Sequence, residues 1–301
     1  MNHFSMELAI FAVIPAILLC GYIFHEDRIE REPLGLIALL FGAGALSYFP
    51  VYFIQQAIFK FIDGMFADKM SFSAEGILSY SSEGSRIAHL ALCSFFGYSL
   101  IKILIAWAIL FFFTRKNNNF NYLFDGIVYS TFIFLGFALV ENIFFFTQND
   151  IELMAPKILT SVPSNLFVGI LMGYYHTMWH MRFVANGIEK DLLAAKLVSE
   201  DKVRTSAPWL ISSIFVPVLI NAFYNMAGTV NSDIAVMIFY CAVFFAFGIS
   251  FIAVRRMALR DAAYGRYLFR IIAKGHPDLS AETIKKFVNN EIDGEERDIK
   301  E

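Results

Sequence analysis

The chain has 301 residues, of which 57% are hydrophobic and 17% charged, and its mean hydropathy is +0.57. Soluble domains carry about a quarter charged residues, so this composition excludes an ordinary soluble domain and predicts a polytopic membrane protein. The net charge of −3 is small and gives no indication of a nucleic-acid partner. The cysteines all fall in apolar segments, which is typical of small core residues and not of a disulfide framework: Cys20, Cys93 and Cys241.

Seven apolar runs are long enough to cross a bilayer, which takes about 20 helical residues. They lie at residues 6–24, 34–62, 87–113, 122–146, 158–184, 209–227 and 234–254. The first run has no basic leader or cleavage signature, so we interpret it as a retained helix and not as a signal peptide. The sequence therefore predicts an all-α transmembrane bundle of about seven spans over residues 1–254.

Basic residues predict the orientation of this bundle in the cell membrane. They gather in alternate loops and at the end of the chain: Arg28, Arg31, Arg115, Lys116, Lys190, Lys196, Lys202, Arg204 and the segment 255–300. The opposite loops offer few: Lys69, Arg86 and Lys157. Because cytoplasmic loops carry the excess of Lys and Arg, we expect the N-terminus outside and the C-terminus in the cytoplasm.

The tail over residues 255–301 changes character. Its first part, RRMALRDAAYGRYLFRIIAK, places apolar residues at near-helical spacing among basic ones. This pattern predicts a juxtamembrane amphipathic helix on the anionic inner leaflet. Ser280, followed by Glu282, predicts the cap of one more brief helix, after which we expect disorder.

The run 122–146 is the one around which we expect the bundle to be organised. It carries Glu141 and Asn142 inside its outer third and Asp125 near its start. An acidic side chain near the bilayer centre costs roughly 2.5–3.5 kcal/mol, so Glu141 should face protein or a water-filled cavity and have a partner. Glu141 is therefore the first candidate site residue. The alternative is a protonated Glu141 that only forms a hydrogen bond to a neighbouring helix.

Polar residues on four spans lie at similar depth when about 1.5 Å is counted per helical residue from the outer ends. Glu141, Asn165 and Asn221 share one layer, Asn142 and Asn225 lie close to it, and the third span adds, somewhat deeper, Tyr98, Ser99 and Lys102. This arrangement predicts an outward-opening hydrophilic cavity, with interhelical hydrogen bonding as the alternative.

Lys102 needs a counter-charge in mid-span, which Glu141 or Asp125 could supply; a snorkelling lysine is the alternative. His176 and His180 have the i, i+4 spacing of metal ligands, but their run YYHTMWHMR is typical of an interfacial anchor. We therefore predict no metal site from the sequence, and the cofactor stays undetermined.

Several runs together resemble one known family. They are DRIEREP at 27–33, LLFGAGALS after it, FDGIVY from Phe124, LGFALVEN ending at Asn142, GILMGYY from Gly169 and PVLINAFYN from Pro217. In this register, over about two thirds of the chain, they resemble the PrsW family of intramembrane proteases. The resemblance implies a helical bundle in the glutamic-type group, associated with cleaving membrane-anchored regulators.

The chain departs from the family pattern at positions that matter for hydrolysis. The resemblance implies a Glu-Glu-x-x-Lys motif on the third span, and here Lys102 is present while Tyr98 and Ser99 replace the two acids. Asn165 and Asn221 stand where the family pattern has histidines. Hydrolysis needs a group that takes a proton from water and a second group or a metal ion to assist it, and asparagine does neither.

Three functions are compatible with these residues. The first is an intramembrane peptidase that handles membrane-anchored or peptide substrates, with Glu141 as general base and Lys102, Asn165 and Asn221 positioning water and carbonyl. The second is a catalytically silent relative that still binds such partners as a regulator; the substitutions favour it. The third, a transporter, is disfavoured because no repeats or paired broken helices are visible.

Overall fold

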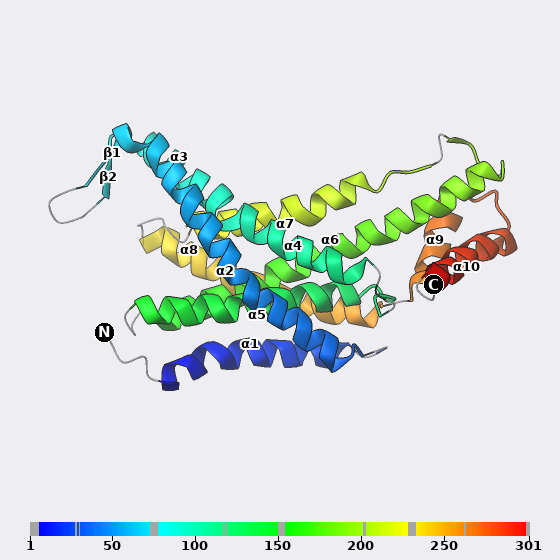
Figure 1. Cartoon of the computed structure of the whole chain (residues 1–301), viewed down its shortest axis with the longest axis horizontal. Coiled ribbons are helices and arrows are strands. Elements are labelled where there is room, and N and C mark those ends of the chain that lie inside the picture. The colour runs from blue at the N-terminus through cyan, green and yellow to red at the C-terminus, as the bar shows by residue number, and fades with distance from the viewer. Residues whose placement is uncertain are drawn as a thin grey trace.

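The computed structural model describes residues 6–27, 29, 31–72, 78–115, 117, 119–149, 154–200, 203–227, 233–261 and 263–298. Four basic residues used to predict the orientation lie outside the described residues: Arg28, Lys116, Lys202 and Lys300. Within the described part, long helices run side by side in an elongated bundle (Figure 1), which confirms the predicted all-α polytopic fold.

The elements follow one another along the chain in this order. They are α1 (Met6–Glu26), α2 (Leu34–Met65), η1 (Ala67–Lys69), β1 (Met70–Phe72), β2 (Leu78–Tyr80), α3 (Glu83–Leu92), η2 (Cys93–Leu100), α4 (Ile101–Thr114), α5 (Asp125–Gln148), α6 (Met154–Ala194), α7 (Ala207–Ala227), α8 (Asp233–Leu259), α9 (Tyr264–Gly275) and α10 (Ala281–Asp298). The two strands form an antiparallel hairpin, in which Ser71 pairs with Ser79.

Helix α5 lies at the centre of the bundle, as the sequence predicts. In its apolar window 72% of the residues are buried, whereas the corresponding share in α8 is 11%. In a membrane, lipid can cover the apolar side chains of outer helices, whereas most of α5 is covered by neighbouring helices. A carboxylate on this helix therefore meets protein groups before it meets lipid.

Glycines let α2 approach α5 closely. A Cβ atom on Gly44 would overlap the backbone carbonyl of Ile133, and one on Gly136 would overlap the carbonyl of Phe41. Small residues at such contacts are typical of helix packing in membranes, where close backbone approach replaces the hydrophobic effect.

The third predicted span is one helical segment with an irregular middle. The helices α3 and α4 are joined without a break by η2, which has π-helical hydrogen bonding over eight residues. Hydropathy does not distinguish π from α geometry, so this segment could not be predicted from it. Since π segments often occur at functional sites, the position of Tyr98 and Ser99 inside η2 is relevant to the site.

Six helices among the described residues are long and apolar enough to cross a membrane. The first predicted span corresponds to α1, of which the part from Ile14 to Glu26 is apolar but shorter than a spanning helix. A total of seven spans therefore remains a prediction. In Figure 1 the β1–β2 hairpin and the start of α1 lie at one end of the bundle, and α9 and α10 lie at the other.

The tail packs on the bundle more extensively than the sequence predicts. Helix α6 continues past the predicted end of its span to Ala194, and this extension forms a second core with α9 and α10. Leu268 and Ile272 are buried there. The Ser280 side chain accepts a hydrogen bond from the Thr283 N–H (3.1 Å), as expected for the cap, but the helix it begins reaches Asp298 and is not brief.

Candidate functional site

Glu141 is held between two lysines from neighbouring helices. The Lys157 Nζ of α6 donates a hydrogen bond to Glu141 Oε1 at 2.9 Å, and the Lys102 Nζ of α4 lies 3.7 Å from Glu141 Oε2. Of the two counter-charges that the sequence offers for Lys102, Glu141 is the one that lies beside it. The two contacts join three helices, α4, α5 and α6, at one point.

Aromatic rings complete the surroundings of the two lysines. The Lys102 ammonium lies 4.4 Å from the centroid of the Phe137 ring, and the Lys157 ammonium lies 5.3 Å from that of Phe145. The side chain of Lys102 is 9% exposed and that of Glu141 27%. Ring faces attract cations, so the aromatic rings add to the contacts of the two lysines, while the Glu141 carboxylate keeps one partly open side.

Asn165 of α6 belongs to the same cluster. Its Nδ2 donates a hydrogen bond to the backbone oxygen of Ser161 at 2.8 Å, and its side chain lies within electrostatic range of Glu141. Its Oδ1 has no hydrogen-bond partner among the described residues. We call Lys102, Glu141, Lys157 and Asn165 the polar cluster.

Asn221 of α7 forms a hydrogen bond with η2. Its Nδ2 donates a hydrogen bond to Ser99 Oγ at 3.0 Å, and this hydroxyl donates to the Ser94 carbonyl at 2.7 Å. Asn225 donates in turn to the Asn221 carbonyl at 2.7 Å. The bond between Asn221 and Ser99 ties α7 to the π-helical segment, and such interhelical hydrogen bonding is the alternative to a cavity that the sequence left open.

Two other predicted cavity residues, Tyr98 and Asn142, take separate places. Tyr98 packs on Phe59 of α2, with 4.8 Å between the ring centroids, and is 43% exposed, although it remains within electrostatic range of Glu141. Asn142 is fully buried, and its amide has no hydrogen-bond partner among the described residues.

Asp125, contrary to the prediction, does not lie near Glu141 or Lys102. It is buried at the first turn of α5, and its Oδ2 accepts hydrogen bonds from the backbone N–H groups of Asn121 (2.9 Å) and Tyr122 (2.7 Å). At 1.5 Å per residue, it is roughly 24 Å along the helix from Glu141. Its carboxylate accepts hydrogen bonds from the loop that leads into α5 and so fixes the start of the helix.

Lys157 was missed from the sequence, where it served only as a loop residue for the orientation. Helix α6 begins at Met154, before the predicted start of its span, so Lys157 stands in the first turn of the helix. Its long side chain can reach the depth of Glu141 from that position. Had the helix been predicted to start one turn earlier, the need of Glu141 for a positively charged partner could have identified Lys157.

His176 is not an interfacial anchor as the sequence suggested. It is fully buried, its Nε2 lies 2.8 Å from Thr114 Oγ1, and its ring packs on Trp107 and Trp179. His180 continues this aromatic cluster by packing against Phe120. Neither histidine belongs to a group of three potential metal ligands among the described residues.

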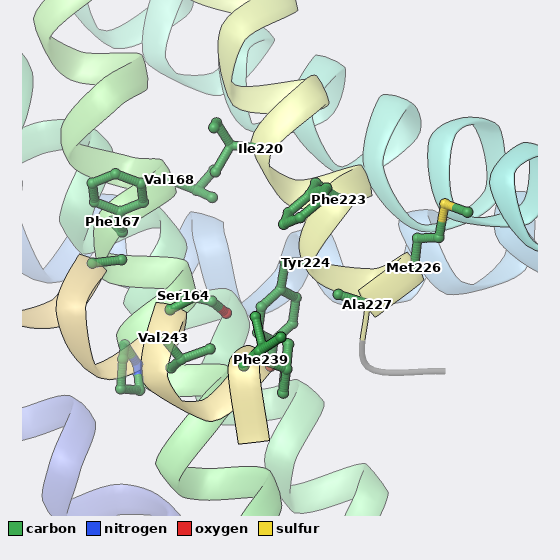
Figure 2. Close-up of a pocket in the computed structure, with 14 residues that line it drawn as sticks. Ser164, Phe167, Val168, Ile220, Phe223, Tyr224, Met226, Ala227, Phe239 and Val243 are labelled. Carbon is green, nitrogen blue, oxygen red and sulfur yellow. The ribbon is translucent and has the colours of Figure 1, made fainter. Parts of the chain in front are cut away.

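An apolar groove of about 450 Å³ opens beside the polar cluster, between α6, α7 and α8. In Figure 2 Ser164 and Tyr224 stand on its wall among apolar side chains. Tyr224 packs on Phe239 of α8, with ring centroids 5.2 Å apart, and lies within electrostatic range of Lys157 and Glu141. The residues that line the groove carry no charge, but Tyr224 on its wall lies close to the charged groups of Lys157 and Glu141.

Comparison with known proteins gives a consistent result. The model of a family described as PrsW family intramembrane metalloprotease matches residues 32–251. A relative named Protease PrsW from Geobacillus kaustophilus is 31% identical over 54% of the chain and 62% of the relative. The proteins of that name from Halalkalibacterium halodurans and Bacillus subtilis are 29% and 27% identical, over 71% and 78% of the chain and 80% and 87% of the relatives. No solved structure matches significantly.

The family description implies a metal ion, and the polar cluster does not fit one. Within the described residues, Glu141 is not part of any group of three side chains that could bind a metal. Two ammonium groups flank its carboxylate, and their positive charge disfavours a divalent cation beside them. Asn165 and the Asn221–Ser99 pair offer neutral oxygens only, which are weak ligands for a catalytic zinc ion.

Proposed function

Because the chain belongs to the PrsW family of intramembrane metalloproteases, we propose that it engages membrane-anchored polypeptides beside the polar cluster and does not hydrolyse them. The observation that carries this proposal is the position of Glu141 between Lys102 and Lys157. It makes the protein a silent member of a peptidase family, acting as a membrane regulator through binding.

Hydrolysis of a peptide bond needs a base that takes a proton from water and an acid or a metal ion that stabilises the developing charge. The Glu141 carboxylate is flanked by two lysine ammonium groups. Asn165 cannot replace a second acid. Each positioned acid or base typically contributes about 10²–10⁴-fold to the rate, so a site without them should hydrolyse near background.

The groove between α6, α7 and α8 is the docking surface that this proposal requires. Its apolar lining suits a transmembrane segment, and Ser164 and Tyr224 offer hydroxyl groups to polar atoms of such a segment. The two lysines and one carboxylate of the polar cluster leave a net charge of +1, which favours peptide carbonyls or an acidic side chain nearby. In the orientation expected from the basic loops, this surface lies in the outer half of the bilayer.

An active peptidase is the second candidate, and one observation favours it. Glu141 Oε2 is buried and accepts no hydrogen bond from the described residues, since Lys102 lies 3.7 Å away. A water molecule placed there could donate a proton to this oxygen, with Lys102 and Asn165 positioning the substrate carbonyl.

Photo-crosslinking from the groove tests the binding proposal. The full chain is placed in liposomes with a panel of tagged single-span peptides, and a photoreactive phenylalanine analogue replaces Phe239 in the groove or, as the control, Phe245, which is 72% exposed on the same helix. We expect peptide adducts from position 239 and few from position 245, with the captured peptide intact. Equal labelling from both positions, or adducts with lipid alone, would contradict the proposal.

A further inference from the structure

Asp63, His89 and Cys93 meet at the end of the bundle that carries the hairpin. His89 Nε2 lies 2.8 Å from Asp63 Oδ1 and 3.7 Å from Cys93 Sγ, and the three ligand atoms all lie within 4.8 Å of one another. His89 and Cys93 are four residues apart on one continuous helical segment, so they share a face, and Asp63 stands in the last turn of α2.

A second residue fixes the histidine ring in this arrangement. The Tyr80 hydroxyl of β2 lies 3.0 Å from His89 Nδ1, which directs Nε2 at Asp63 and Cys93. Metal-binding histidines almost always hold their second ring nitrogen in such a hydrogen bond, which sets the tautomer and the ring orientation.

Apolar side chains enclose the inner side of this group. Cys93 is packed in a small hydrophobic cluster with Ile62 and Phe66, and the Phe66 ring lies 5.2 Å from the His89 ring. His89 and Cys93 are buried, whereas the side chain of Asp63 is 54% exposed. The group is therefore dry on one side and open to water on the other.

We infer that Asp63, His89 and Cys93 form a binding site for a divalent zinc-type ion, separate from the polar cluster. A thiolate, an imidazole and a carboxylate are the ligands that zinc prefers, and three protein ligands leave the fourth tetrahedral position for water. Bond lengths of about 2.0–2.3 Å place tetrahedral ligands roughly 3–4 Å apart. The distance between His89 and Cys93 already meets this requirement, and the exposed Asp63 side chain needs to move by less than about 1 Å.

The charges and protons of this site balance. When the ion binds, the Cys93 thiol loses its proton to solvent, and His89 stays neutral with its proton on Nδ1, from which it donates to the Tyr80 oxygen. One thiolate and one carboxylate then neutralise the divalent ion. The ion would fasten the hairpin, the end of α2 and the start of the third span to one another.

Cobalt binding tests this site without any activity measurement. The full-length protein is purified in detergent, stripped with a chelator and titrated with Co²⁺, whose charge-transfer absorption reports a thiolate ligand. We expect one Co²⁺ per chain with this absorption, and a higher midpoint of thermal unfolding when Zn²⁺ is added, because an ion that binds only the folded state stabilises it. Tyr80→Phe should weaken Co²⁺ binding about 10–100-fold, as the loss of an outer-sphere partner does.

Cysteine variants give the matched comparison. Cys93→Ser should lose the thiolate absorption, while Cys241→Ser, at an exposed position in α8, should retain it. Size-exclusion chromatography shows whether each variant is folded. The inference would be overturned if the unaltered protein shows neither the absorption nor the Zn²⁺-dependent shift, or if Cys93→Ser shows the same absorption.

Discussion

The contribution of Glu141 to stability depends on its two charged partners, Lys157 and Lys102. Removing one partner of a desolvated ion pair leaves the other without compensation, which costs more than the pair itself contributes. The hydrogen bond of 2.9 Å from Lys157 should therefore outweigh the contact of 3.7 Å with Lys102.

A double-mutant cycle measures this difference. Glu141→Gln and Lys157→Met should be coupled by about 0.5–3 kcal/mol in the free energy of unfolding in detergent, as residues in direct contact are. The matched cycle of Glu141→Gln with Lys102→Met should give a smaller coupling because the two groups lie further apart. A Lys157 cycle with no coupling would show that the hydrogen bond does not contribute to stability.

Part of this site could be predicted from the sequence. The cost of burying charge in a membrane identified both Glu141 and Lys102, because it depends only on residue type and depth. Lys157 was missed because the predicted span began at residue 158, whereas α6 begins one turn earlier, at Met154. Asp125 was misplaced because its hydrogen bonds go to a loop whose path the sequence does not specify.

The length of the apolar runs predicted the positions of the helices well. It did not predict the π-helical segment η2 or the full length of α6. Hydropathy reports whether a segment can lie in lipid, so it predicted where the helices are. The central place of α5 was predicted from the polar residues inside its apolar run. Hydropathy carries no information on the π-helical η2 or on the extension of α6 beyond the membrane, because these depend on contacts with other helices.

Glycine positions distinguish close helix contacts from open surfaces. Gly136→Ala should lower the free energy of unfolding by about 1–3 kcal/mol, because the added methyl group forces α5 away from the Phe41 carbonyl of α2. Gly42→Ala is the control on α2, since a Cβ there has no atom within 4 Å. It should be neutral or slightly stabilising. Equal effects of the two substitutions would argue against the close contact between α2 and α5.

Across the whole molecule, the two ends of the bundle differ in character. The hairpin end carries the group of Asp63, His89 and Cys93, and the opposite end carries the second core of the α6 extension with α9 and α10. The sequence predicted the amphipathic nature of the tail, but not that its apolar face would be covered by α6 and α10.

Cysteine labelling in intact cells tests the predicted orientation. In a background that lacks Cys20 and Cys241 but keeps the buried Cys93, an impermeant reagent should label Ser79→Cys in β2 and should not label Lys285→Cys in α10. Both positions are exposed, so access and not burial decides the result. Labelling of position 285 from outside would reverse the orientation.

The most direct test of the central claim is a cleavage assay on the purified protein in liposomes, with and without Glu141→Gln. Single-span peptides are incubated with each form, and mass spectrometry quantifies the products, while circular dichroism verifies that the variant is folded. We predict no products above background from either form, because the polar cluster offers one neutralised carboxylate and no metal site. Cleavage by the unaltered protein that disappears in the folded Glu141→Gln variant would contradict this account and make Glu141 the catalytic base.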